Sequence, residues 1–222
     1  MKELVIFGTG KIAECVSYYF EREREWRIVA YCCDRSHMKE GSFLGNPVIA
    51  FEDVKKLYPP ERYLMFVALG YHGMNSLRRT KYEEALNKGY ELASYVSPNV
   101  YGKFLVGNNS LILDDAVIQP FVSIGNNVFI WGGAMIGHHA VIREHSWITG
   151  SANVGGLSDI GEASFLGMNA TVGPEVKVGA KCLLGANSLV TKSVPDNSVI
   201  IVRDTEVYRL DVDNFLRLTS SF

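Results

Sequence analysis

A six-residue period runs through the second half of this chain and limits what that half can fold into. From Val106 to Val190, every sixth residue is isoleucine, valine or leucine, over fifteen consecutive units. The residue four places further along each unit, from Ser110 to Val194, is always serine, alanine, valine or cysteine. An α-helix turns every 3.6 residues and cannot keep these positions on one face. The segment is therefore an internal repeat and not a series of helices.

The repeat predicts a solenoid with three short flat faces per turn. One branched residue per face points inward, and one small residue fits each tight corner. Eighteen residues then make a coil, and successive coils pair as parallel strands about 4.8 Å apart. We expect about five coils. The ends of such a rod need covering, which the first half of the chain and a short helix in "RLDVDNFLRL" would provide, unless that helix packs on a neighbour.

The first half of the chain has a different pattern, in which short apolar runs alternate with amphipathic ones. Leu4–Phe7, Arg27–Cys33 and Tyr63–Gly70 read as buried strands, and a helix is expected between Asn75, as its N-cap, and Gly89. Strands alternating with helices favour a parallel sheet covered on both faces. We expect a small Rossmann-like α/β domain over residues 1–98, a solenoid over 99–195 and a C-terminal extension over 196–222.

Composition narrows the classes of partner. The net charge is −2, so there is no electrostatic case for binding nucleic acid or an anionic membrane. The four cysteines form no CxxC motif and are expected to be free thiols in a reducing compartment. The apolar run Leu4–Phe7 is too short for a signal peptide, and no later segment is long enough to span a membrane. We expect a cytoplasmic protein.

The repeat [Ile/Leu/Val]-Gly-x-x-[small]-x, from about Val106 to Val194, resembles the signature of the left-handed β-helix acyltransferases. With "LVIFGTGKIAE", "GYHGMNSLRRTKYEEALNKGYELASYVSPNV" and "GHHAVI" included, the whole chain resembles bacterial sugar acyltransferases, typified by the sialic acid O-acetyltransferases and the bacillosamine-pathway N-acetyltransferase. The resemblance implies a left-handed helix and a homotrimer with active sites between subunits. It also implies acetyl-CoA as co-substrate, no metal, and a nucleotide-linked sugar as acceptor, for polysaccharide or glycan synthesis.

Two adjacent histidines, His138 and His139, fall at a corner of the predicted solenoid and should point outward. An imidazole titrates near neutral pH, which suits a general base in acyl transfer. The resembled N-acetyltransferases place their base two residues after the inward residue, which here is His138. An acidic residue usually follows that base and orients it, but here His139 follows. Either histidine can therefore be the base, with Glu144 or a neighbouring subunit as the orienting group.

Further residues are expected around the thioester and the coenzyme. One coil beyond His138 lies a glycine whose backbone N–H would be open to a thioester oxygen. Another histidine of the repeat, His145, would bind substrate or pack at a subunit contact. The residues expected to bind acyl-CoA, along a groove between solenoids, are Trp147, Gly156, Met168, Ala186 and Lys192.

The turn "GTGKIA", Gly8–Ala13, follows a strand and opens a helix, as in nucleotide-binding domains. Its glycines let a phosphate approach the helix N-terminus, and Asp34 follows the next strand. The resemblance implies that Gly8, Gly10, Lys11 and Asp34 bind the nucleotide of the nucleotide-linked sugar.

Three functions remain open at this point. The first is an acyl-CoA-dependent sugar N- or O-acetyltransferase, and the second is a non-catalytic solenoid that binds a nucleotide sugar. The third is a zinc enzyme like the γ-class carbonic anhydrases, which needs three converging imidazoles. Adjacent His138 and His139 are expected to diverge, which disfavours zinc. The sequence does not identify the sugar, the nucleotide or the acyl chain length.

Overall fold

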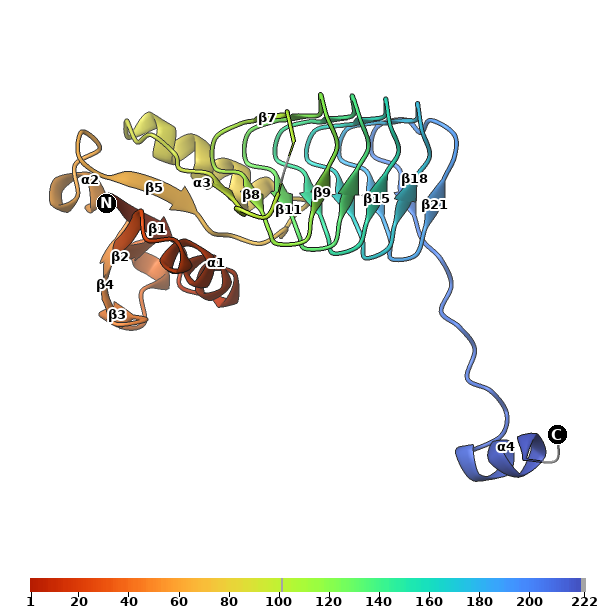
Figure 1. Ribbon diagram of the computed structural model, residues 1–222. Helices are drawn as coiled ribbons and strands as arrows, with labels where there is room; N and C mark the ends of the chain where they lie inside the picture. The colour runs from red at the N-terminus through yellow and green to blue at the C-terminus, as the bar shows by residue number, and fades with distance from the viewer. Residues whose placement is uncertain (101, 221–222) are drawn as a thin grey trace.

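The computed structural model describes residues 1–100 and 102–220 and shows an α/β unit beside one end of a three-sided rod (Figure 1). The α/β unit holds a five-stranded sheet in the order β3-β4-β2-β1-β5. Four strands are parallel and β3 is antiparallel to β4. The strands are β1 (Lys2–Phe7), β2 (Trp26–Cys33), β3 (Ser42–Phe43), β4 (Asn46–Ala50) and β5 (Leu64–Val67).

Helices cover both faces of this sheet, as predicted. The helices are α1 (Lys11–Arg22), a 3-10 turn (Arg35–His37), α2 (Val54–Leu57) and α3 (Ser76–Asn87). Residues on one face of the strands pack with α1, and residues on the other face pack with α2 and α3. Asn75 precedes α3 as expected, but its side chain does not cap the helix. Its backbone is left-handed (φ 66°), and its amide donates instead to the carbonyl of Ala163 in the rod, at 3.2 Å.

The rod has three parallel sheets, which we call faces I, II and III. Face I contains β7 (Leu105–Val106), β10 (Ser123–Ile124), β13 (Val141–Ile142), β16 (Asp159–Ile160) and β19 (Lys177–Val178). Face II contains β6 (Tyr95–Val96), β8 (Leu111–Ile112), β11 (Phe129–Ile130), β14 (Trp147–Ile148), β17 (Phe165–Leu166), β20 (Leu183–Leu184) and β22 (Val199–Ile200). Face III contains β9 (Val117–Ile118), β12 (Met135–Ile136), β15 (Asn153–Val154), β18 (Thr171–Val172) and β21 (Leu189–Val190).

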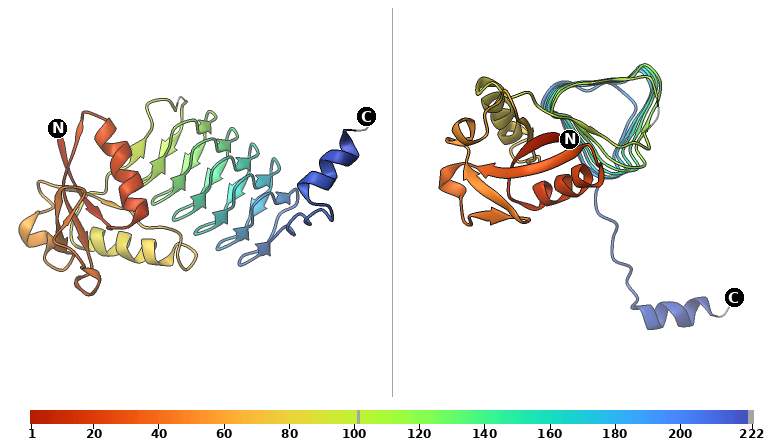
Figure 2. Two further views of the ribbon diagram at one scale, coloured as in Figure 1. Left: turned by 90° about the horizontal axis from the view of Figure 1, so that it is seen from below. Right: turned by 60° about the vertical axis from the view of Figure 1, so that its left-hand side comes forward.

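The coil of eighteen residues is confirmed by the strand register, which pairs Phe129 with Trp147 and Met135 with Asn153. The branched residues from Ile112 to Val190 are at most 4% exposed and fill the rod. The first residue of the series, Val106 on the first coil, is the exception and is 36% exposed. The view along the rod shows its triangular outline, with the α/β unit against one side (Figure 2). The predicted α/β unit followed by a left-handed parallel β-helix of about five coils is confirmed.

Every corner from Asn109 to Asn187 uses a left-handed residue directly before the small one. The repeat pattern predicts the small residue but not this conformation. All but one of these left-handed residues carry a side chain, and they include Phe121 and Leu157. Branched or bulky residues pay a steric cost there, of about 1 kcal/mol or more. The stacked coils impose the turn on them, so tertiary packing overrides local preference.

The prediction that the C-terminal helix covers the end of the rod is wrong. Helix α4 (Val212–Thr219) has no buried residue and lies away from the rod at the end of an extended segment (Figure 1). Val194 and Ile200, which follow the last repeat unit, pack against the core at that end of the rod in place of α4. None of the helices within the described residues is long and apolar enough to cross a membrane.

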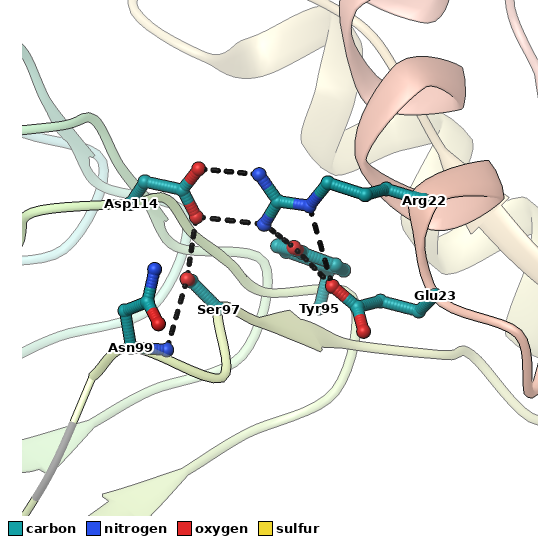
Figure 3. Close-up of polar contacts among 6 residues, drawn as sticks. All are labelled: Arg22, Glu23, Tyr95, Ser97, Asn99 and Asp114. Carbon is teal, nitrogen blue, oxygen red and sulfur yellow. Dashed lines mark hydrogen bonds and ion pairs between the residues drawn. The ribbon is translucent and has the colours of Figure 1, made fainter.

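An arginine–aspartate pair joins the α/β unit to the first coil (Figure 3). Arg22, at the end of α1, donates two hydrogen bonds to Asp114, at 2.5 and 2.8 Å. Ser97 donates a further bond to the same carboxylate at 2.5 Å. These bonds, led by the one from Arg22, lower the pKa of Asp114 to about 2. The ion pair is bidentate, a geometry that fixes the orientation of the two side chains as well as their distance.

A buried arginine makes the second joint. Arg78 of α3 is 0% exposed, and its guanidinium lies 4.5 Å from the ring centre of Phe129 on face II. Its Nη2 donates to the carbonyls of Asn127, His145 and Ser146, at 2.8–3.3 Å. Burial lowers the pKa of Arg78 to about 9, so the side chain is still charged at pH 7.

Replacing Arg78 should loosen the docking of the α/β unit. Arg78→Met keeps most of the length but leaves buried carbonyls without donors, each worth about 1–3 kcal/mol. We expect the free energy of unfolding in urea to fall by about 3 kcal/mol. The matched control is Arg79→Ala, on the same helix, whose half-exposed ion pairs contribute at most about 1 kcal/mol. Equal effects of the two substitutions would contradict this role.

Candidate functional site

His138 and His139 lie at the corner between faces III and I, which we call the histidine corner, and both are exposed, as predicted. The backbone of this corner is held by neighbouring coils. The N–H of His138 donates to the side-chain oxygen of Gln119 at 2.8 Å, and the N–H of His139 donates to the carbonyl of Pro120 at 3.2 Å. His139 is the left-handed residue of the corner, with φ 59°.

The two imidazoles face each other, so the expectation that they diverge is wrong. Their Nδ1 atoms are 3.2 Å apart and the ring planes meet at 85°. The left-handed backbone at His139 breaks the alternation of side chains that an extended strand would give, which allows this contact. The ring of His139 also packs on Phe121, with ring centres 4.8 Å apart. Glu144, the expected orienting residue, bonds Asn126 at a different corner, at 2.6 Å.

The ring of His138 lies over Gly156, one coil further on. A Cβ added to Gly156 would lie 2.9 Å from Nε2 of His138 and 3.0 Å from its Cε1. Only a glycine leaves room for the ring in this place. The stacking of His138 and Gly156 that the eighteen-residue coil predicted is present, and Nε2 is held beside the glycine backbone.

His145 lies at another corner, between faces I and II, and is 4% exposed. Asn127 donates its amide to Nδ1 of His145 at 2.9 Å, and the ring meets Tyr82 of α3 at 5.5 Å. Burial, followed by the charge of Arg79, lowers the pKa of His145. The expectation of a substrate contact or a subunit contact is wrong, because the side chain is buried under the α/β unit of its own chain.

The three imidazoles therefore sit at two corners and do not converge. Within residues 1–100 and 102–220, no group of three or more His, Cys, Asp or Glu side chains lies close enough to hold a metal ion. The structure gives no support to the zinc alternative.

A cavity of about 550 Å³ lies between the α/β unit and the corner that joins faces II and III. We call it the aromatic cavity, because its walls include Tyr71, Trp131, Trp147 and Phe165. Tyr71, Trp131 and Phe165 were not predicted from the sequence. Positions 147 and 165 lie eighteen residues apart and point outward on face II, so the repeat could have predicted that their aromatic rings are neighbours. Tyr71 comes from the loop after β5 and reaches the cavity only because the α/β unit docks on the rod.

The residues expected to bind acyl-CoA do not all lie at one place in the structure. Trp147, Met168 and Ala186 line the aromatic cavity. Trp147 is 2% exposed, and the guanidinium of Arg78 lies 5.0 Å from its ring centre, so it also belongs to the junction between the α/β unit and the rod. Gly156 lies at the histidine corner, and Lys192 is exposed just after β21. The last two do not line the cavity.

The turn between β1 and α1 borders two smaller cavities that share Gly10. One, of about 380 Å³, continues along Lys11 to Tyr71 and so reaches a wall of the aromatic cavity. The other, of about 430 Å³, lies toward Cys33 and the β3–β4 hairpin. Gly8 is required at this turn, because its φ is 126° and a Cβ would lie 2.7 Å from the carbonyl oxygen of Ala68.

Asp34 is not brought together with this turn. Its carboxylate accepts a hydrogen bond from Lys81 of α3 at 2.7 Å, and it lines a separate cavity with Glu52 and Glu84. The side chain of Lys11 is exposed and pairs with Glu14 at 2.7 Å. Three of the four expected nucleotide residues thus share one place, and the fourth is tied to α3.

Two family models match the repeat. Residues 105–138 match the bacterial transferase hexapeptide family (six repeats), and residues 159–192 and 175–200 match the hexapeptide repeat of succinyl-transferase. The predicted hexapeptide repeat is confirmed. No curated protein matches the chain in sequence.

Solved structures share the fold over 90% of this chain. The acetyltransferase domain of PglB from Neisseria gonorrhoeae is 24% identical, with 96% of that chain covered and a TM-score of 0.80. A mutant of perosamine N-acetyltransferase from Caulobacter crescentus, in complex with CoA and GDP-perosamine, is 23% identical, with 93% covered and a TM-score of 0.80. WeeI from Acinetobacter baumannii is 16% identical, with 96% covered and a TM-score of 0.59.

The buried His145 should make stability depend on pH. Its pKa in the folded chain lies below the ordinary value of 6.5, so the unfolded chain binds a proton that the native chain refuses. Stability should therefore fall as pH drops through about 6.5. His145→Asn, which matches Asn127 one coil earlier, should reduce the loss of urea midpoint between about pH 7.5 and about pH 5.5. An unchanged loss in this variant, with exposed His72→Asn as control, would refute the assignment.

Gly156→Ala should displace the ring of His138 while the fold survives, because Gly156 is outside the left-handed region. The measurement is a crystal structure of the variant, together with the shift of the His138 ring signals in NMR. Gly173→Ala is the control, since a Cβ there would meet nothing closer than 3.6 Å. If the ring stays in place in Gly156→Ala, the ring of His138 is not packed closely against Gly156.

Proposed function

We propose that this hexapeptide-repeat protein is an acyl-CoA-dependent acetyltransferase that acts on an amino or hydroxyl group of a nucleotide-linked sugar. The observation that carries the proposal is the exposed imidazole of His138, with Nε2 held beside the Gly156 backbone. It sits on a fold shared with the acetyltransferase domain of PglB and with a perosamine N-acetyltransferase. One is described in complex with CoA and GDP-perosamine, and the PglB domain also in complex with acetyl coenzyme A.

The chemistry is a direct attack on the thioester. Nε2 of His138 accepts the proton of the acceptor amine or hydroxyl as that group attacks the thioester carbon. A general base in this position typically contributes about 10²–10⁴-fold. The N–H of Gly156 would donate to the oxyanion that develops on the carbonyl. As the C–S bond breaks, the proton on His138 passes to the sulfur of coenzyme A, which returns the base to its starting state.

The α/β unit, residues 1–98 in our division, would bind the nucleotide. A diphosphate at Gly8, Gly10 and Lys11 would lie at the positive end of α1, a twelve-residue helix. From that turn the cavity runs past Tyr71 toward the aromatic cavity, which gives the sugar a path to the rod. Asp34 would contact the ligand only if its bond to Lys81 gave way.

The site would need a second copy of the chain. The histidine corner joins faces III and I, whereas the aromatic cavity lies at the corner of faces II and III. One rod does not present both corners to a single substrate. We therefore propose a homotrimer in which one subunit brings His138 to the cavity of its neighbour. Acyl-CoA would run between the rods, against Trp147, Met168 and Ala186, with Gly156 at the thioester and Lys192 toward the phosphates.

His138→Asn should abolish most of the activity. With acetyl-CoA and a panel of nucleotide-linked amino sugars, we expect thiol release to fall by about 100-fold or more. Because His138 is exposed, the variant should fold, and Leu157→Ala at the same corner serves as the control.

Two outcomes would contradict the enzyme. One is a wild-type protein that binds a nucleotide sugar but releases no thiol with any acceptor, which would favour a non-catalytic solenoid. The other is undiminished release after both His138 and His139 are changed to Ala.

A further inference from the structure

His138 and His139 make an imidazole–imidazole hydrogen bond that the proposed mechanism does not use. The two Nδ1 atoms lie 3.2 Å apart, and the two rings meet edge to face. Within the described residues neither imidazole is paired with a carboxylate. The charged side chains on the same corner of nearby coils are Lys103, which lies 6.0 Å from the Phe121 ring, and Glu175. The group bonded to His138 is therefore another imidazole and not a carboxylate.

We propose that His139 is a positioning residue whose Nδ1 accepts the Nδ1 proton of His138 and so keeps Nε2 of His138 free to take a proton. The proposal rests on the proposed function, since it assigns His138 as the base. It also names the orienting group, which the sequence analysis sought in Glu144 or in another subunit.

Counting protons leads to this assignment. A bond between two Nδ1 atoms holds one proton, because one ring nitrogen must donate and the other accept. In each ring, the role of Nδ1 in this bond, as donor or acceptor, fixes which tautomer the ring adopts. If His138 donates, its Nε2 is unprotonated and His139 carries its own proton on Nε2. If His139 donates, the two rings exchange these states, so only one Nε2 can act as a base.

The surroundings decide between the two states. Nε2 of His138 lies beside Gly156, where a backbone N–H can serve the oxyanion. The ring of His139 packs instead on Phe121 of the preceding coil, 4.8 Å away between centres. A base at His138 is next to an oxyanion donor, whereas a base at His139 would face an aromatic ring. The chemistry therefore requires His138 to donate and His139 to accept.

A neutral acceptor has a consequence for pH. When His138 takes a proton at Nε2, its Nδ1–H stays bonded to His139, and the pair carries one positive charge. A second proton on Nδ1 of His139 would set two donors against each other and break the bond. A carboxylate in place of His139 would stabilise the imidazolium more strongly.

The chain itself supplies the variants for a test. Position 139 is the left-handed position of its corner. The same position on other coils holds Phe121 and Glu175, and the left-handed position of a corner between faces II and III holds Asn169, all with φ between 56° and 67°. Asn, Phe and Glu should therefore fit at 139 without new backbone strain. His139→Asn keeps an acceptor, His139→Phe keeps a ring against Phe121 but removes the acceptor, and His139→Glu adds charge.

The first readout is the pH profile of thiol release from acetyl-CoA, with the nucleotide-linked amino sugar that the wild-type protein acetylates. We expect His139→Phe to lose about tenfold or more in kcat, with KM for acetyl-CoA unchanged. His139→Asn should recover most of that loss. His139→Glu should stay active, with its acid limb moved to higher pH by about one unit. A purely structural role for the ring predicts full activity in His139→Phe and would overturn the proposal. A dead His139→Asn with an active His138→Asn would make His139 the base and also overturn it.

The second readout does not need an acceptor. Nitrogen-15 NMR of the ring of His138 in the resting protein should show the proton on Nδ1 in wild type and in His139→Asn, and a changed tautomer balance in His139→Phe. A proton on Nε2 of His138 in wild type would refute the positioning role. If wild type releases no thiol while His138 is protonated at Nδ1, the enzyme assignment fails and the hydrogen bond stands.

Discussion

The left-handed residue before the small one at each corner is the constraint on which the rest of the structure depends. It turns the chain in six residues and so closes a coil in eighteen, which places each side chain above its equivalent on the next coil. The Asn109, Asn127 and His145 ladder under α3 follows from that stacking. The ring of His138 over Gly156 follows from it as well. Neither arrangement needs its own folding signal, because the coil supplies the position and the sequence supplies only the side chain.

Much of the fold could be predicted because its signals are periodic. Fifteen inward residues at a fixed spacing specify the faces, the coil and the direction of every strand. The left-handed corners could not be predicted in the same way, since residues such as Phe121 and Leu157 do not favour that backbone and adopt it under the packing of neighbouring coils. The sequence could not decide whether the C-terminal helix covers the rod or packs on a neighbour, for a simpler reason. Its amphipathic pattern indicates a helix but not where the apolar side chains pack.

In the candidate site, too, the features that follow from the repeat could be predicted and those that depend on packing could not. Counting eighteen residues from His138 was enough to predict Gly156 beneath it. The contact between His138 and His139 depends on side-chain torsions at a left-handed residue, which spacing does not report. The roles of Arg78 and Asp34 depend on where α3 docks: the helix carries Arg78 onto the carbonyls of the rod and Lys81 onto Asp34. Such contacts between segments distant in sequence are where analysis of a single sequence ends.

The three-cornered coil also limits how such a chain can change in length. One edge of the prism is taken up by α3, another carries the paired histidines, and the third borders the aromatic cavity. Adding or removing six residues in mid-rod would rotate everything downstream by a third of a turn and exchange these edges. A gain or loss of eighteen would leave every edge in phase. An insertion or deletion within the rod that preserves these three edges should therefore add or remove a whole coil.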